Sequence, residues 1–227
     1  MVRTRFFRRR SLRVAVPSLA LCGVLAGIAL FGGSTANATV CTPNAGEGCV
    51  DITGGTLTFT APTTLAFPST SITGLDQWVY DQRAADQKIV VNDARGLLGV
   101  GSGWNVGVVA STFTCTTTGT CGGDTLGAFK LNGSTSANDD TTAPSSACTA
   151  SSTCTPPTNS LASSYPVTMT TDGSTLNKVF TAAQDTGLGS ITLGDTPDPI
   201  VWWLGIPATA RIGTYTSTLT LSINAGP

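Results

Sequence analysis

IVVNDARGLLGVGSGWNVGVVASTFT, residues 89–114, carries the clearest indication of the fold class. β-Branched and aromatic residues crowd both of its ends, whereas four glycines interrupt its middle. Strands favour the first kind of residue and turns the second, so the stretch predicts two strands joined by a glycine-rich turn. Asp93 and Arg95 are two residues apart and would share one face of a strand, where their charges can pair. Trp104 and Val106 share a face in the same way.

A second segment of similar character closes the sequence, GTYTSTLTLSINAGP at residues 213–227. Tyr215, Leu219, Leu221 and Ile223 fall at even spacing there, with threonine or serine between them. An alternation with a period of two is typical of a strand that buries one face. The segment therefore predicts a half-buried strand.

The sequence from residue 52 onward is that of an all-β domain. Short runs of β-branched and aromatic residues are separated by clusters of Gly, Pro, Asp and Ser, as in an antiparallel β-sandwich. Residues 75–87 and 177–184 are ambiguous between a strand and a short helical turn, and in the first of them we expect Trp78 and Tyr80 to belong to a strand or its approach. Strands are predicted at residues 56–61, 64–67, 88–93, 104–114, 126–131, 166–171, 190–193, 200–205 and 215–224.

Residues 133–164 form a low-complexity insertion in this pattern. Ser and Thr make up 16 of the 32 residues, so the segment can bury little apolar surface. We expect an exposed, solvated loop. A loop that contacts a ligand or carries O-linked sugars is the alternative.

Residues 1–38 have the features of a secretory signal peptide. Six arginines precede an apolar run of 13 residues, and an Ala-Asn-Ala motif then offers a small-x-small cleavage site between Ala38 and Thr39. An uncleaved membrane anchor is one alternative, but it would need about 20 apolar residues. Two further alternatives are a lipoprotein modified at Cys22 and twin-arginine export through Arg9 and Arg10.

Removal of the signal peptide would leave an acidic chain. The 189 residues from Thr39 onward hold six basic and 13 acidic residues, a net charge of −7. Without a basic patch there is no electrostatic case for nucleic acid or an anionic membrane as a partner. The length suits one domain with a sizeable core.

Six cysteines remain after cleavage and fall into three close pairs. An even number of cysteines in an exported chain predicts disulfides, and pairing between nearest neighbours is the simplest of the 15 possible connectivities. Such short loops would each pin a local turn. The absence of histidine and of any C-x-x-C motif argues against zinc. The pairs are Cys41 with Cys49, Cys115 with Cys121, and Cys148 with Cys154.

The residues needed for catalysis are scarce. The lack of histidine rules out Ser-His-Asp and Cys-His arrangements, and the cysteines are committed to disulfides. A glycosidase would need two carboxyl groups about 5–9.5 Å apart, whereas the aspartates are scattered through turns. We therefore expect no enzyme, no cofactor and no metal. A calcium site at Asp195 and Asp198, or at Asp139 and Asp140, is the alternative.

Two motifs, in order, resemble the WxL domain of Gram-positive surface proteins. The first is Asp93-Ala94-Arg95-Gly96 followed by Gly103-Trp104-Asn105-Val106, and the second runs from Tyr215 to Pro227. Residues 126–133 and 204–215 are also similar to the sequence that lies between the two motifs in the family. Two positions depart from the family pattern: Val106 stands in place of leucine, and Leu221 stands in place of a second tryptophan.

The resemblance implies an exported, immunoglobulin-like antiparallel β-sandwich that attaches to the Gram-positive cell wall by contacting peptidoglycan. No sorting motif or apolar tail follows the last strand, which agrees with non-covalent attachment and with no membrane contact after cleavage. The expected division is a signal peptide at 1–38, a Cys41/Cys49 loop at 39–55, and a WxL-like sandwich at 56–227 with its insertion at 133–164.

Aromatic and polar side chains on a sheet face are the means by which such a sandwich would hold a sugar polymer. Trp202 and Trp203 are adjacent, so we expect at most one of them in the core and the other at a surface, at an interface or under a loop. For Trp104 and Tyr215 a structural role is the alternative, as is a structural ion pair for the two charged residues. The candidates for wall binding are Trp104, Val106, Tyr215, Trp202, Trp203, Asp93 and Arg95, with Trp78 and Tyr80 as further aromatic residues.

The alternative function is that of a structural or adhesive surface subunit. A secreted β-sandwich with an exposed edge strand can assemble with itself or with other surface proteins. Sedimentation with the wall and concentration-dependent oligomers are the observations that separate the two functions.

Overall fold

The computed structural model describes residue 50 and residues 52–117, 120–150 and 152–227. Regular structure there consists of antiparallel strands and one short 3-10 helix, which confirms the all-β prediction. No helix in these ranges is long and apolar enough to cross a membrane. The predicted signal peptide, its cleavage site at Ala38 and Thr39, and the Cys41/Cys49 pair lie outside the described residues.

The first layer of the sandwich is formed by β4 (Trp104–Ala110), β5 (Phe113–Cys115), β6 (Thr125–Leu126), β10 (Asn177–Ala182), β13 (Tyr215–Thr216) and β14 (Leu219–Ala225). β4 lies between β10 and β14, and β5 lies between β13 and β6. The predicted strands 104–114 and 215–224 are therefore each divided in two. The break is stabilised by Ser111 Oγ, which accepts the N–H of Thr218 at 2.8 Å.

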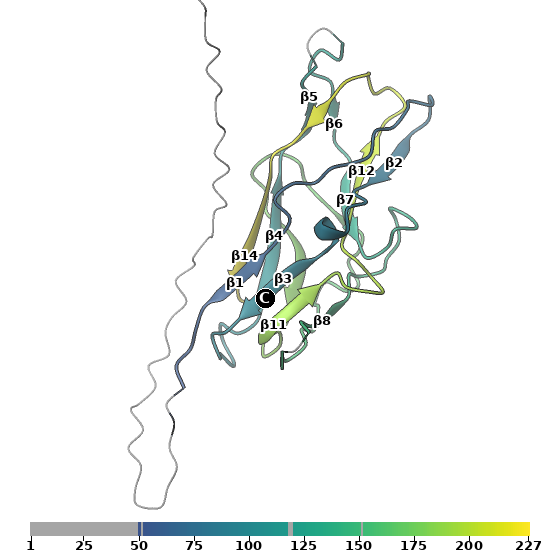
Figure 1. Cartoon of the computed structure of the whole chain (residues 1–227). Helices are drawn as coiled ribbons and strands as arrows, with labels where there is room; N and C mark the ends of the chain where they lie inside the picture. Colours follow the sequence, from purple (N-terminus) through teal and green to yellow (C-terminus); the bar gives the residue numbers. More distant parts are fainter. Residues whose placement is uncertain (1–49, 51, 118–119, 151) are drawn as a thin grey trace, which may run out of the picture.

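The second layer is formed by β1 (Leu57–Thr60), β2 (Gln77–Tyr80), β3 (Ile89–Asp93), β7 (Phe129–Asn132), β8 (Ser146–Cys148), β9 (Val167–Thr168), β11 (Gly189–Leu193) and β12 (Val201–Ile206). These strands pair in the orders β1-β3-β11-β8 and β2-β12-β7-β9. The 3-10 helix η1 (Ala84–Gln87) separates β2 from β3. Figure 1 shows β2, β12 and β7 in one half of the molecule and β3, β11 and β8 in the other.

The two strands predicted within residues 89–114 are present, but they do not pair with each other. β3 belongs to the second layer and β4 to the first, so the glycine-rich turn carries the chain across the sandwich. The turn is fastened by Arg95, whose guanidinium donates to both carboxylate oxygens of Asp93, at 2.9 and 2.7 Å. It also donates to the carbonyl oxygens of Gly101 and Gly103, at 3.1 and 2.7 Å. The predicted pairing of Asp93 with Arg95 is confirmed, and both side chains are buried.

Alternation along the strands sends one set of apolar side chains into a single core between the layers. Phe129 stacks on Trp202 with ring centroids 6.0 Å apart and meets Phe113 edge-on at 5.5 Å. The largest fully buried side chains are Trp104, Trp202, Phe129, Ile89, Leu131, Ile191, Leu193, Ile223, Val91, Val106, Val108 and Val201.

Residues 64–67, predicted as a strand, form no strand. They run as an extended strap between β1 and β2, held from the side by two charged residues. Asp81 Oδ2 accepts the N–H of Ala66 at 2.6 Å, and Arg83 Nη2 donates to the carbonyl oxygen of Thr64 at 2.7 Å. Side chains thus occupy the hydrogen-bonding positions that a neighbouring strand would have filled.

The Ser/Thr-rich insertion is more integrated than the expected solvated loop. It contains β8, which pairs with β11, and it buries Pro144 and Pro157. Cys148 and Cys154 form a disulfide across this segment, with Cα atoms 5.5 Å apart. The composition indicated low apolar content correctly, but backbone pairing and a covalent link do not require apolar side chains.

Candidate functional site

Most of the residues singled out for wall binding lie inside the sandwich. Trp104, Val106 and Trp202 have no exposed surface, and Asp93 and Arg95 are 2% and 5% exposed. The indole of Trp104 stacks on Phe180, and its Nε1 donates to the carbonyl oxygen of Gly187 at 2.8 Å. Because these side chains are buried and contact other parts of the sandwich, they stabilise the fold. None of them presents a surface to a polymer.

Both tryptophans are buried, but only Trp202 belongs to the core cluster, and Trp203 lies under a loop, which is one of the expected arrangements. They do point to opposite faces of β12. Trp202 enters the core and donates from Nε1 to the backbone oxygen of Asp86 at 3.0 Å. Trp203 points outward but is covered by a loop, where its Nε1 lies 3.0 Å from Asn132 Oδ1 and 3.2 Å from the carbonyl oxygen of Ser134.

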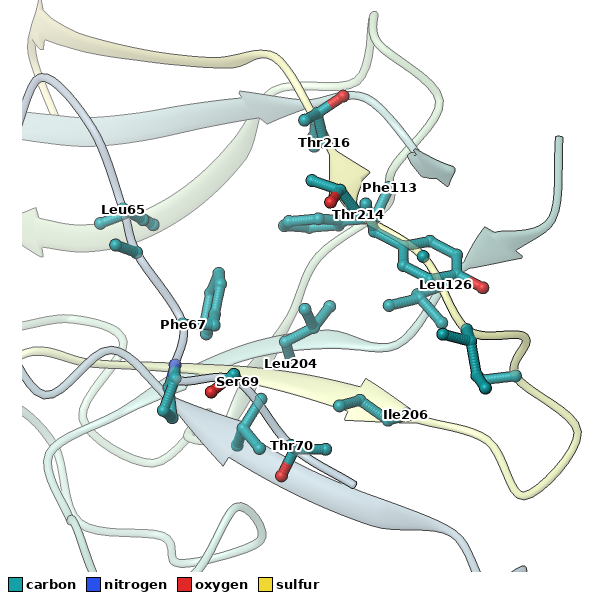
Figure 2. Close-up of a pocket in the computed structure, with 18 of the residues that line it drawn as sticks. Leu65, Phe67, Ser69, Thr70, Phe113, Leu126, Leu204, Ile206, Thr214 and Thr216 are labelled. Atoms are coloured by element: carbon teal, nitrogen blue, oxygen red, sulfur yellow. The ribbon is translucent and has the colours of Figure 1, made fainter. Parts of the chain in front are cut away.

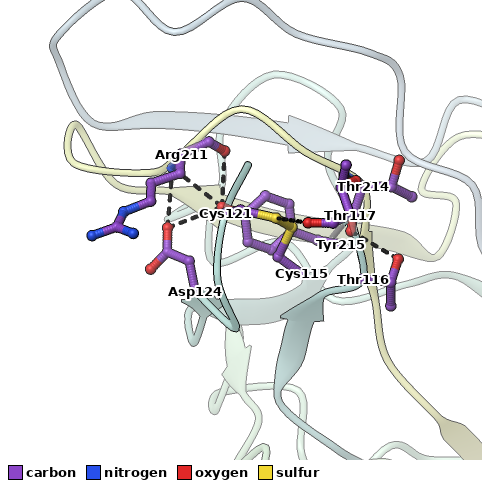
Figure 3. Close-up of a disulfide and its surroundings, with 8 residues drawn as sticks. All are labelled: Cys115, Thr116, Thr117, Cys121, Asp124, Arg211, Thr214 and Tyr215. Carbon is purple, nitrogen blue, oxygen red and sulfur yellow. Dashed lines mark hydrogen bonds between the residues drawn. A yellow bond between two sulfur atoms is a disulfide. The ribbon is translucent and has the colours of Figure 1, made fainter. Parts of the chain in front are cut away.

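Tyr215 ties down the end of β13 (Figure 3). Its hydroxyl lies 3.0 Å from Asp124 Oδ2 and 2.9 Å from the carbonyl oxygen of Arg211, and it accepts the N–H of Arg211. The Cys115–Cys121 disulfide lies beside it, with Cα atoms 6.0 Å apart. Two of the three predicted cysteine pairings are therefore present in the described residues.

An aromatic surface lies on the outer side of β2, β12 and β7. The strand register places Trp203 opposite Tyr80 on one side and Lys130 on the other, with Trp78 opposite Gly205 in the next row. We call Trp78, Tyr80, Trp203 and Lys130 the aromatic face. The rings of Tyr80 and Trp203 are 4.8 Å apart, and Lys130 Nζ lies 4.8 Å from the ring centre of Trp78.

Gly205 sets the position of Trp78 on this face. A Cβ atom at residue 205 would lie 3.2 Å from Cη2 of the Trp78 ring and 2.8 Å from Cβ of Ala128. Only glycine leaves room for an indole to lie this close to the backbone of β12. Trp78 and Tyr80 are only partly buried, and both line the cavity described next.

A polar loop at residues 133–141 borders the aromatic face. Asn132 is fully buried and pins the loop, because its Nδ2 donates to the carbonyl oxygens of Ala137 and Asp140 at 2.8 and 3.2 Å. Lys130 Nζ donates to Asn138 Oδ1 at 3.3 Å. The loop and the face border an open cavity of about 600 Å³ lined by Pro68, Thr70, Trp78, Val79, Tyr80, Gln82, Thr135, Ser136, Ala137, Asn138 and Trp203.

A larger cleft of about 930 Å³ opens between the two layers (Figure 2). Its floor and walls are mainly aliphatic and phenyl groups, among them Leu65, Phe67, Leu204 and Ile206. Sugar recognition needs flat aromatic rings combined with amides and hydroxyls. The smaller cavity at the aromatic face meets that requirement better, although the cleft has more volume.

Two buried carboxyl groups lie near each other at the bend between β2 and β3. Burial, followed by the hydrogen bond and negative charge of Asp81, raises the pKa of Asp86 to about 6. Burial also acts to raise the pKa of Asp81, but hydrogen bonds from Arg83 and Ala66 outweigh it and lower that pKa. Neither carboxyl group lines either cavity. Their place in the fold is that of a structural cluster around Arg83.

We expect Asp86→Asn to stabilise the protein at pH 7 by about 1–2 kcal/mol, because the native state pays to ionise a carboxylic acid whose pKa is raised. The native protein binds this proton more tightly than the unfolded chain does. The contribution of Asp86 to stability therefore falls as the pH rises from about 4 to 6 and stays low above that range.

Urea unfolding at pH 4.5 and pH 7 measures this effect. The gain for Asp86→Asn should be larger at pH 7 than at pH 4.5, whereas Asp139→Asn, on an exposed carboxylate, should change neither value. A variant less stable than the parent at pH 7 would show that the ion pair with Arg83 outweighs the cost of burial.

The described part of the chain holds no group of three or more Cys, Asp or Glu side chains placed to bind a metal ion. A family model described as WxL domain, surface cell wall-binding, matches residues 39–227. No curated protein and no solved structure matches the chain.

Proposed function

Because the chain belongs to the WxL family of surface domains that bind the cell wall, we propose that it holds peptidoglycan through the aromatic face and catalyses no reaction. The observation that supports this choice of site is the half-exposed pair Trp78 and Tyr80 beside a rim of amides and hydroxyls. The protein is a cell-surface, wall-associated protein. We propose peptidoglycan as the polymer that it binds and the aromatic face as the surface that contacts it.

The geometry offers the two kinds of contact that a glycan strand requires. The apolar C–H face of a sugar ring would stack on the open parts of Trp78 and Tyr80, as aromatic rings accept flat apolar groups. Gln82, Ser136 and Asn138 would then exchange hydrogen bonds with the ring's hydroxyl and acetamido groups. Lys130 supplies a cation for the anionic groups of the wall polymer.

The rigidity of the site favours attachment. Trp203 is locked beneath the rim by hydrogen bonds, and Trp78 is seated on Gly205. These side chains would lose little conformational freedom on binding. The smaller entropic cost raises the affinity without any additional contact. Repetition of the same contact along a polymer would hold many copies of the protein on one wall.

Truncation of the exposed rings should abolish most of the attachment. We expect Trp78→Ala and Tyr80→Ala each to weaken sedimentation with purified insoluble peptidoglycan by about tenfold or more, because central aromatic residues dominate binding energy. The rings are half-exposed, so the free energy of unfolding should fall by only about 1 kcal/mol. The measurement is the bound fraction against peptidoglycan concentration.

Leu176→Ala is a suitable control, since Leu176 is 44% exposed and lies over Gly107, on the other layer. Its binding should equal that of the parent. Peptidoglycan stripped of covalently attached polymers tests the ligand: binding lost on stripping would assign the site to another wall polymer. No sedimentation, together with concentration-dependent oligomers in solution, would favour the structural subunit and contradict the proposal.

A further inference from the structure

The cleft between the layers reaches the core of the sandwich. Phe113, Leu126 and Leu204 form its deepest part, and each is exposed by only about a twentieth of its surface. Figure 2 shows Phe67 and Ile206 facing the same space from the strap and from the end of β12. The volume of about 930 Å³ lies near the upper end of the range, about 300–1,000 Å³, that small-molecule sites occupy.

Both walls of the cleft are fastened from outside. The strap at residues 64–67 is held by Asp81 and Arg83, through the contacts with Ala66 and Thr64 given above, and residues 68–72 continue this wall. The opposite wall, residues 213–219, is held by the hydroxyl of Tyr215 and packs against the Cys115–Cys121 disulfide. A space bounded by pinned walls is a formed site, because closing it would break these contacts.

The mouth of the cleft carries a single charge. Arg211 is the one charged residue among those that line the cleft, its side chain is exposed, and within the described ranges it forms no salt bridge. The nearby carboxylate of Asp124 already accepts the backbone N–H of Arg211. Ser69, Thr70 and Thr214 are among the residues that line the cleft. The cleft is thus apolar within, and the one cation among its lining residues, Arg211, lies at one end of it, near Gly122 and the carboxylate of Asp124.

We propose that this cleft binds an amphiphile with one alkyl chain and an anionic head group, the chain lying on Leu204 and Phe113 and the head on Arg211. The cleft adjoins the cavity at the aromatic face, with which it shares Pro68, Thr70 and Val79, but it contains none of the four residues of that face, and the proposal does not depend on wall binding. An extended peptide fits less well, because each residue would bring a backbone N–H and C=O into an apolar interior that leaves them unpaired. A methylene chain carries no such groups.

Displacement of dansyl-undecanoic acid from the whole protein tests the proposal. Palmitate and hexadecyl phosphate should each displace one probe per chain, and affinity should rise along the C10 to C16 fatty acids by up to about fourfold per methylene. Arg211→Gln should weaken both anions about five- to tenfold and leave hexadecanol unchanged. A preference for palmitate or for hexadecyl phosphate identifies the head group as a carboxylate or a phosphate.

Ile206→Glu should abolish displacement, since it places a carboxylate in the path of the chain. Leu98→Glu makes the same change at an exposed position outside the cleft and should bind as the parent does. If Ile206→Glu does not fold, 16-doxyl stearate replaces it, and its spin label should broaden the methyl NMR signals of Leu65, Leu204 and Ile206. No binding below the micelle concentration, no chain-length dependence, or broadening elsewhere would overturn the proposal.

Discussion

Trp104→Ala is expected to lower the free energy of unfolding by about 3–5 kcal/mol, the range for a large aromatic side chain removed from a packed core. Trp104 is fully buried, and its indole stacks on Phe180 with ring centroids 5.6 Å apart. The substitution also leaves the carbonyl oxygen of Gly187 without its donor. Guanidinium unfolding monitored by circular dichroism gives the value.

Trp104→Phe separates packing from hydrogen bonding at this position. It retains a ring against Phe180 and loses the N–H, so we expect a smaller loss of about 1–3 kcal/mol. Because Trp104 is remote from the aromatic face, the fraction of either variant that remains folded should sediment with the wall as the parent does. A stable Trp104→Ala protein that no longer binds would show instead that this indole acts in attachment.

Arg95→Leu is expected to lower stability by a similar amount, about 3–5 kcal/mol, because it leaves a buried carboxylate without its counter-ion. Arg95 donates four hydrogen bonds within the turn between β3 and β4, two of them to Asp93. Their loss frees both the carboxylate and the carbonyl oxygens of Gly101 and Gly103. Urea unfolding at pH 7 measures the change.

A double-mutant cycle with Asp93→Asn isolates the ion pair. Once Arg95 is replaced, Asp93→Asn removes an uncompensated charge, so the double variant should be about 1–2 kcal/mol more stable than Arg95→Leu alone. Additive losses would mean that the two charges do not interact in the native state. That result would show that the ion pair between Asp93 and Arg95 does not stabilise the turn.

The strands were predictable where periodicity and composition agreed. β1, β3, β11 and β12 match their predicted ranges to within two residues, because each is a short run of apolar or β-branched residues bounded by turn formers. The division of β4 from β5 was not predictable. It depends on a contact between Ser111 and Thr218, which are distant in the sequence. Local propensity does not predict such contacts.

The site was less accessible to sequence reasoning than the fold. Adjacent residues on a strand do point to opposite faces, which Trp202 and Trp203 obey, but pointing outward did not mean exposure. The loop pinned by Asn132 covers Trp203, and nothing in the run Ser134 to Asn138 indicates where that loop lies. Trp78 and Tyr80 could be found by their alternation, whereas Lys130 and Gln82 join them only through strand register.

The turn that fastens the two layers also lies next to both ends of the folded body. The N–H of Gly55 donates to the carbonyl oxygen of Ala94, and the N–H of Gly226 donates to that of Gly103. β2 and β12, which carry the aromatic face, lie toward the other end of the molecule in Figure 1. A fluorescent protein joined at either end of this folded body would therefore lie away from the proposed wall-binding surface and should leave wall attachment unchanged.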